Sequence, residues 1–508
     1  MTLIDDRVGA LPAGAAPAAR RGAALALLVA SHFLLNLDSA IVEVALPSIK
    51  NDLGIALADL SWVANAYILA FGGFLLLGGR LGDLFGRRSV FIGGLAVFAA
   101  ASLAGGLASS PALLVAARAA QGLAAAVISP TALALLMAVY PDRTAAERTE
   151  RNKALATLGA VAATGGSAGY FLGGVLTDAF GWQSTFLVNV PVAAAAALAA
   201  PRLLPRGARP GARGRFDVLS ALLVGAGMTL LVYVLLGAPA AGWLSVRTVG
   251  LGVVAAVALV LFLLRQRTSS DPLLPLRIFR HRALRGANVI AALVNMAIGP
   301  VIFFLSLYTQ QVLGYSALAA GLAILPVILT VTVSSTLAGR LLRQLSQRAV
   351  MAAGLSLFAA GLLWMGFISG GAYWTELLLP ECLVGLGGGL VFVTFTVSGT
   401  SGLDEADSGS ASGVLTTAQK VGASLGLAVL TALADARTRA AAGGGAQEAG
   451  ALLAGYQSAI WAAAVPVVLG LVAAAVWLPG RGGHGGAVRG RREAAGLRTQ
   501  EPCRSIPE

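Results

Sequence analysis

The sequence predicts an all-α protein that crosses a membrane many times. Of its 508 residues, 57% are hydrophobic and only 12% are charged, whereas soluble domains carry roughly 25% charged residues. The apolar residues fall in windows of about 20, the length that an α-helix needs to cross a bilayer. The net charge of +13 comes from cations in short clusters between these windows, which indicates membrane topology and argues against a nucleic-acid partner.

Fourteen such windows follow one another along the chain. The first run continues past Leu37 toward Pro47, so we expect an uncleaved span there and not a signal peptide. The windows are 23–47, 58–79, 88–109, 112–139, 153–176, 184–204, 217–237, 246–265, 284–308, 317–338, 349–369, 374–398, 411–434 and 457–478.

Positive charges occupy alternate connections between the windows. Cytoplasmic loops of membrane proteins are enriched in Lys and Arg, so we expect these connections and both termini on the cytoplasmic side of the cell (inner or plasma) membrane. The connection 400–412 is an exception, because it contains three acids and no cation. The cationic connections are 80–88, 143–153, 202–215, 265–285, 340–348 and the C-terminal tail.

The order of the windows predicts two six-helix bundles with two extra spans between them. Segment 339–348 repeats the Gly, Arg, Leu and final Arg of segment 79–88 at the same spacing, which indicates related halves. The expected units are a cytoplasmic tail (1–22), an N-terminal six-helix bundle (23–204), a linker with two extra spans (205–283), a C-terminal six-helix bundle (284–478) and a second cytoplasmic tail (479–508).

The connection after the second window, Gly78–Val90, combines glycines, an aspartate and arginines, which is more than a simple turn requires. A glycine at the end of a span lets a neighbouring helix approach, and an aspartate at a helix boundary accepts hydrogen bonds from arginine and from free N–H groups. We therefore expect a cytoplasmic latch that holds one conformation, the alternative being a cationic loop with an incidental acid. The latch residues are Gly79, Asp83, Gly86, Arg87 and Arg88.

The first window carries two carboxyls at membrane depth, Asp38 and Glu43. Each costs roughly 2.5 to 3.5 kcal/mol on insertion scales, so each calls for a function. On a helix, Glu43 shares a polar stripe with His32 and Asn36, whereas Asp38 points about 120° away. We favour Glu43 for loading and releasing a proton or for binding a cationic substrate, but Asp38 could equally be the proton site. The alternative for either carboxyl is a structural brace.

The fourth and fifth windows hold two further signals. Arg118 lies inside the membrane beside Gln121, and a buried arginine needs an anion or several carbonyls. Pairing with a carboxyl of the first half would couple protonation to the arginine, while a snorkelling cation is the alternative. The segment Gly165–Gly174 has glycines at four-residue spacing, which suits close helix packing and bending.

Later ionisable residues are few. Glu381 and Lys420 lie inside apolar windows and are possible cavity residues, the alternative being a position at the membrane interface. The three histidines lie in separate segments, and the two cysteines, Cys382 and Cys503, lie in different environments. We therefore expect no metal site, no cofactor and no enzyme activity.

Together these segments resemble the fourteen-span drug:proton antiporters of the major facilitator superfamily. The matching fragments are LDSAIVEVALPSI in the first span, RLGDLFGRR in the loop, RAAQG in the fourth span and GYFLGG in the fifth, where Gly169, Gly173 and Gly174 form the antiporter motif. The resemblance implies two bundles that rock around a central cavity in the lipid bilayer. It also implies export of hydrophobic or cationic drugs or antibiotics, driven by a proton gradient and without a cofactor.

Two positions depart from that family's pattern. Glu43 stands where the family usually has asparagine, and Tyr170 replaces the usual proline after Gly169. The first departure bears on substrate charge and proton stoichiometry, and the second on the direction and coupling of transport. Alternative functions are export of an endogenous metabolite or siderophore and, from another class, a polytopic membrane enzyme.

Overall fold

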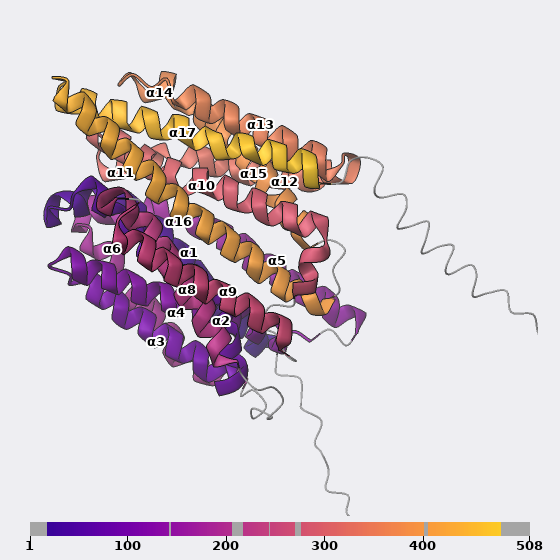
Figure 1. The fold of residues 1–508 in the computed structure, drawn as a ribbon. Coiled ribbons are helices and arrows are strands. Elements are labelled where there is room, and N and C mark those ends of the chain that lie inside the picture. Colours follow the sequence, from indigo (N-terminus) through magenta and orange to yellow (C-terminus); the bar gives the residue numbers. More distant parts are fainter. Residues whose placement is uncertain are drawn as a thin grey trace, which may run out of the picture.

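The computed structural model describes residues 18–141, 144–205, 217–242, 244–269, 276–400 and 405–478. All regular secondary structure in these ranges is helical. Figure 1 shows the helices of the first half, in indigo and purple, beside those of the second half, in pink to yellow. The fold is therefore all-α, as the composition predicts.

The helices fall into three groups along the chain. The first half contains α1 (Ala18–Leu53), α2 (Leu57–Phe85), α3 (Arg87–Gly106), α4 (Pro111–Val139), α5 (Ala145–Phe180), α6 (Gln183–Leu187) and α7 (Asn189–Leu203). The middle contains α8 (Val218–Ala241), α9 (Val246–Thr268) and the 3-10 helix η1 (Leu276–Arg280). The second half contains α10 (Arg282–Gln311), α11 (Ala317–Ala323), α12 (Leu325–Gln344), α13 (Gln347–Met365), α14 (Tyr373–Glu376), α15 (Leu378–Thr400), α16 (Glu405–Gly443) and α17 (Glu448–Trp477).

Within the described ranges, eleven helices are long and apolar enough to cross a membrane. Each of the fourteen predicted windows falls on one long helix or on two consecutive helices. Helices α2, α5 and α8 are not among the eleven, so the count of fourteen spans stays a prediction.

Three predicted spans are broken near one end. The breaks separate α6 from α7, α11 from α12 and α14 from α15. A proline follows each break within the first turn of the second helix: Pro191, Pro326 and Pro380. Proline lacks the N–H group that would bond to the preceding turn, but it fits the first turn of a new helix. The sequence therefore explains each break locally.

The two halves pack in the same way. Helices α2 and α3 both pack on α4, and α12 and α13 both pack on α15. Arg88 at the start of α3 donates to the carbonyl of Leu204 after α7 at 3.4 Å. Arg348 at the start of α13 donates to the carbonyl of Ala474 near the end of α17 at 3.5 Å. This correspondence supports the internal repeat, while the domain boundaries remain predictions.

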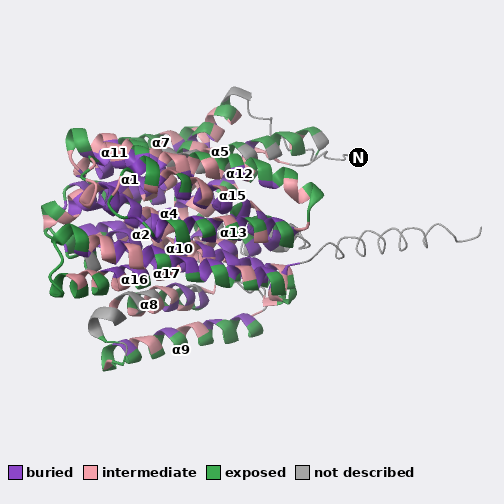
Figure 2. Cartoon of the chain, turned by 90° about the horizontal axis from the view of Figure 1, so that it is seen from above, coloured by how far each residue is buried: buried purple, intermediate pink, exposed green. Residues whose placement is uncertain are grey.

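The two middle helices attach to the edge of this arrangement. Helices α8 and α9 pack on each other, and α8 also contacts α2 and α16, one helix from each half. Figure 2 shows α9 on the rim, with many exposed residues. Val253, Val257 and Val260 of α9 are each more than half exposed, and apolar side chains in that position suit contact with lipid.

Candidate functional site

An ion pair lies inside the first half. Arg118 Nη1 is 2.6 Å from Asp38 Oδ2, and the two side chains are 1% and 0% exposed. Gln121 Nε2 donates to Asp38 Oδ1 at 3.0 Å, and Asn189 Nδ2 donates to the same oxygen at 2.6 Å. Asp38 therefore accepts from three side chains, and charge-assisted bonds of this kind are the strong ones.

The other contacts of Arg118 complete the network. Its Nε donates to the carbonyl of Val63 at 3.0 Å, and its guanidinium lies 4.4 Å from the centroid of the Tyr67 ring. Gln121 Nε2 also donates to Ser102 at 2.8 Å. Arg118 thus has both the anion and the carbonyl that a buried arginine requires, and its 1% exposure makes the snorkelling alternative wrong. The network joins α1, α2, α3, α4 and α7.

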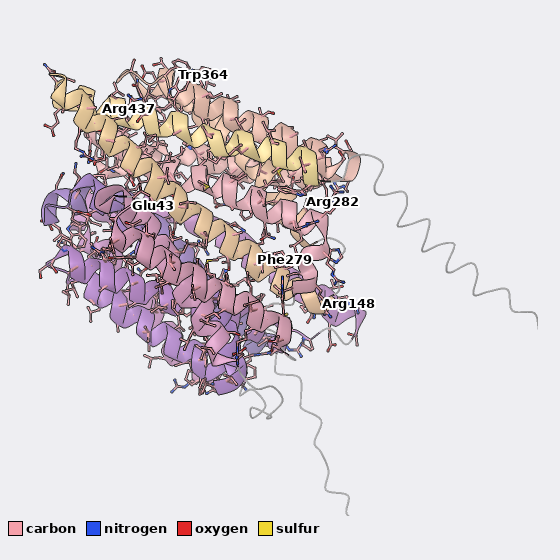
Figure 3. The ribbon with its side chains drawn as sticks, in the orientation of Figure 1. Glu43, Arg148, Phe279, Arg282, Trp364 and Arg437 are labelled. Carbon is pink, nitrogen blue, oxygen red and sulfur yellow. The ribbon has the colours of Figure 1, made fainter. Side chains whose placement is uncertain are left out.

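Glu43 has different surroundings, as its helical spacing from Asp38 predicts. Its carboxylate Oε2 accepts a hydrogen bond from the Tyr170 hydroxyl at 2.7 Å, and the side chain is half-buried. Glu43 and Tyr170 are the two positions that depart from the pattern of the resembled family, and this hydrogen bond joins them directly. Glu43 also lies within Coulombic range of Lys420 on α16. Figure 3 places Glu43 among the central helices, with Arg148 and Arg282 toward one end and Arg437 toward the other.

A cavity of about 540 Å³ lies between the two halves. His32 and Asn36 line it from the first half, and Lys420 lines it from the second. The remaining lining residues are Leu35, Ser39, Ala40, Tyr67, Phe71, Ser129, Gly166, Tyr170, Phe392, Thr396, Ser412, Leu415, Thr416 and Gln419. Among the described lining residues, then, the polar groups are hydroxyls, amides, a histidine and one lysine, and none is a carboxylate. Glu381, predicted as a possible cavity residue, is absent from this described lining.

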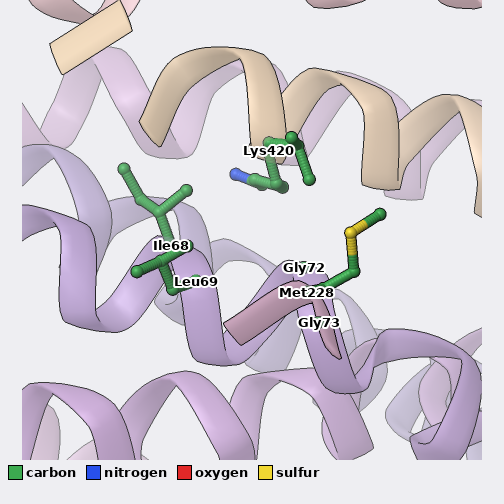
Figure 4. A pocket seen from close by; sticks show the side chains of 7 residues that line it. Ile68, Leu69, Gly72, Gly73, Met228 and Lys420 are labelled. Atoms are coloured by element: carbon green, nitrogen blue, oxygen red, sulfur yellow. The ribbon is translucent and has the colours of Figure 1, made fainter. Parts of the chain in front are cut away.

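Lys420 lies against α2 where it lines the cavity. Figure 4 shows it extending from α16 above Gly72. A Cβ added at Gly72 would lie only 2.7 Å from the Lys420 Cβ. The Lys420 ammonium lies 5.1 Å from the centroid of the Phe71 ring, a cation–π arrangement. Gly72 therefore makes room for the only lysine among the described lining residues.

The glycines of α5 bring its backbone against two other helices. A Cβ at Gly169 would meet the carbonyl of Leu37 at 2.8 Å, and one at Gly173 would meet the carbonyl of Ile41 at 2.7 Å, both on α1. Gly174 faces the second half instead, and a Cβ added at Gly174 would lie 2.7 Å from the carbonyl of Ala317. Approaches this close between backbones are possible only for glycine.

The two halves meet at the end where α1 and α5 finish, which we call the closed end. Here Ser306 Oγ donates to the carbonyl of Glu43 at 3.3 Å, and Gln310 Nε2 donates to the carbonyl of Val44 at 3.1 Å. Asp178 at the end of α5 accepts from the backbone N–H groups of Ala317 and Leu318 on α11, each at 3.0 Å. Glu43 therefore sits between the closed end and the cavity.

The predicted cytoplasmic latch is described in part. Gly86 joins α2 to α3 with φ +88°, a conformation that favours glycine, and Gly79 lies close to Pro130 on α4. Arg87 is exposed and Arg88 is half-buried. The side chain of Asp83 lies outside the described residues, so its role in a latch stays a prediction.

Sequence reasoning missed the partners that complete these sites. Asn189 was visible as a polar residue in the apolar fragment WQSTFLVNVPV, but nothing local connects it with Asp38. The bond between Tyr170 and Glu43 joins α5 to α1, and only packing brings these helices together. Within the described residues there is no group of His, Cys, Asp and Glu that could hold a metal ion.

The family model described as Major Facilitator Superfamily matches residues 28–427. The chain belongs to this family. It is 41% identical over 423 residues to the cephamycin export protein CmcT of Amycolatopsis lactamdurans, covering 82% of this chain and 85% of that protein. It is 38% identical over 428 residues to the puromycin resistance protein pur8 of Streptomyces alboniger, covering 84% of each chain.

Solved structures show the same fold. A bacterial homologue of the human lysosomal transporter Spinster, in an inward-facing and occupied conformation, superposes with a TM-score of 0.66 at 15% identity, covering 91% of this chain and 97% of that one. The POT family transporter PepTSo superposes with a TM-score of 0.64 at 16% identity, covering 89% and 98%. Family and fold together establish that this major facilitator protein is a multi-pass membrane transporter and not an enzyme.

Proposed function

We propose that this major facilitator protein exports a drug-like small molecule across the cell membrane by proton-coupled alternating access. The observation that carries the proposal is the cavity of about 540 Å³ between the two halves, shut at one end by contacts between them. A site between two repeats that rock against each other is the geometry of alternating access. The relatives named for antibiotic export and resistance favour a drug as the cargo.

The predicted orientation gives the cavity a direction. Both termini are expected in the cytoplasm, so α1 begins at the cytoplasmic face and the closed end lies at the outer face. The cavity then faces the cytoplasm, and this conformation is the one that loads the drug. Opening the closed end would require separating α5 from α11 and α1 from α10.

The cavity lining favours an apolar drug that carries hydrogen-bonding groups. Aromatic rings such as Phe71 and Phe392 offer apolar contact, and hydroxyl and amide groups such as Thr416 and Gln419 fix orientation. A cationic drug would be attracted by Glu43 but repelled by Lys420. We therefore place uncharged drugs first and cationic drugs second among the substrates.

Glu43 is the better candidate for carrying the proton. Asp38 is 0% exposed and accepts from three side chains, so protonating it would leave the buried Arg118 without its anion. Glu43 has one described side-chain donor, Tyr170, and lies between the closed end and the cavity. Opening the closed end would expose Glu43 to the outer medium, and closing it would leave Glu43 beside the cavity.

The cycle follows from these positions. With the closed end open, Glu43 takes a proton from outside and the drug leaves. After the halves rock, the proton passes through the cavity to the cytoplasm, and a new drug binds. Asp38 and Arg118 hold the first half together throughout, because their network lies within that half.

The test is Glu43→Gln, measured as drug uptake into everted vesicles with and without a proton gradient. We expect gradient-driven uptake to fall at least about tenfold while the protein remains folded in the membrane, because the amide keeps the shape but binds no proton. The matched control is Glu448→Gln, an exposed acid at the start of α17, which should transport normally. Full gradient-driven uptake by Glu43→Gln would refute the assignment.

A further inference from the structure

Glu381 is a buried carboxyl of the second half that has no cation beside it. The residue lies in the first turn of α15 and is 0% exposed. Its Oε1 atom has no hydrogen-bond partner, and none of the ion pairs between described residues includes it. An ionised carboxylate in this position would keep its charge inside the protein with almost no compensation.

The contacts of Tyr373 show how the carboxyl is accommodated. The Tyr373 hydroxyl lies 2.8 Å from the carbonyl oxygen of Ala323 and 2.9 Å from Glu381 Oε2. A tyrosine hydroxyl has one hydrogen to donate but can also accept. If each contact is a separate two-centre hydrogen bond, Tyr373 donates to Ala323 and a protonated Oε2 of Glu381 donates to Tyr373.

We infer that Glu381 is a second proton-binding site, separate from Glu43, and that it holds a proton while the closed end is shut. The titratable neighbours of Glu381 are Tyr373 on α14 and Cys382 on its own helix, with Tyr315 beyond Tyr373. All three are neutral when protonated, so none supplies the positive charge that an ionised Glu381 would need.

This site connects to the closed end through α11. Ala323 is the last residue of α11, the helix that packs on α5 at the closed end. Two residues earlier, a Cβ at Gly321 would lie 2.5 Å from the carbonyl of Tyr170. The protonated Glu381 thus holds Tyr373 on Ala323 and keeps α11 in position. Loss of the proton would turn the single Tyr373 hydrogen toward the carboxylate, so the Ala323 carbonyl would lose its donor and the attachment would loosen.

Infrared difference spectroscopy tests the proton directly. The full-length protein in lipid nanodiscs is compared with Glu381→Gln, whose amide can still donate to Tyr373 but has no carboxylic acid. We expect the wild-type spectrum to contain a carboxylic-acid C=O stretching band that Glu381→Gln lacks and that the control Glu448→Gln retains. The band should persist at pH values where exposed glutamates are ionised. Its absence from the wild-type protein would overturn the inference.

Tyr373→Phe tests the hydrogen-bond chain. The ring remains in place, and the acceptor for the Glu381 proton is removed. We expect the same band to persist at a shifted frequency, because the acid loses its hydrogen bond. An unmoved band would show that Glu381 does not donate to Tyr373.

The link to the closed end needs a distance measurement and rests on the alternating access proposed above. Spin labels at Phe180→Cys on α5 and Leu322→Cys on α11, both exposed positions, span the closed end. The background carries Cys382→Ala and Cys503→Ala, and its infrared band is checked first. At alkaline pH we expect the wild-type background to gain a longer distance that Glu381→Gln does not. An equal change of distance in the wild-type background and in Glu381→Gln would refute the link. Neither the infrared nor the distance measurement depends on transport.

Discussion

Asp38 and Glu43 are the same kind of group on the same helix, less than two turns apart, yet their hydrogen-bond partners and their places relative to the two halves differ. Asp38 accepts from Arg118, Gln121 and Asn189 within the first half. Glu43 accepts from Tyr170 beside the boundary between the halves, where Lys420 of the second half lies within Coulombic range. The comparison teaches that a carboxylate bonded to three side chains inside one half braces that half, whereas a carboxylate with one such bond between the halves is suited to exchanging a proton.

The largest effect is expected for Asp38→Asn. This change leaves the Arg118 guanidinium buried without an anion, and breaking a buried pair costs roughly 3 to 5 kcal/mol. We expect little folded protein in the membrane and a much lower unfolding temperature in detergent. The double variant Asp38→Asn with Arg118→Gln removes the charge as well and should recover part of the stability. A fully stable, inactive Asp38→Asn would instead make Asp38 the proton site.

Gly174→Ala tests the meeting of the halves at the closed end. The new Cβ would lie 2.7 Å from the carbonyl of Ala317, so the closed end must give way, at a cost of about 1 to 3 kcal/mol. We expect roughly a tenfold loss of vesicle uptake and easier labelling at the closed end from outside. Gly93→Ala is the control, because a Cβ there meets nothing within 4 Å. Equal activity of the two variants would show that Gly174 is dispensable.

Tyr170→Phe isolates the bond between the two unusual residues. The ring stays and the donor to Glu43 is lost, and a hydrogen bond to a charged group contributes roughly 1.5 to 3 kcal/mol. We expect uptake driven by the proton gradient to fall several-fold while folding is retained. Tyr456→Phe, which removes a hydroxyl bonded to Gln311 at 2.7 Å in the second half, should leave the proton dependence unchanged. Equal changes in both variants would reduce Tyr170 to a packing role.

The smallest effect is expected for Lys420→Gln. Removing the ammonium from the cavity lining leaves Glu43 as the nearby charge, so a cationic dye should be exported roughly two- to fivefold faster, a difference of at most about 1 kcal/mol. Uptake of an uncharged dye should be unchanged. Lys50→Gln, near the end of α1, is the matched control. Unchanged transport of the cationic dye would mean that Lys420 does not face the bound drug.

The sequence by itself determined the class of the protein and the local geometry of its helices. Lipid requires every backbone group to be bonded within a segment, so long apolar windows can only be helices. Helical periodicity alone separates Asp38 from the stripe of Glu43, His32 and Asn36. The motif at Gly165–Gly174 likewise predicted close packing, because only glycine permits it.

Only the tertiary structure decided which of these groups meet. Arg118 required an anion, but its choice of Asp38 depends on how α4 packs on α1. Lys420 proved to line the cavity, whereas Glu381, which looked equivalent in the sequence, is buried against Tyr373. Contacts between helices distant in the chain are set by packing and not by local spacing, so no reading of one helix could reveal that Tyr170 and Glu43 are partners.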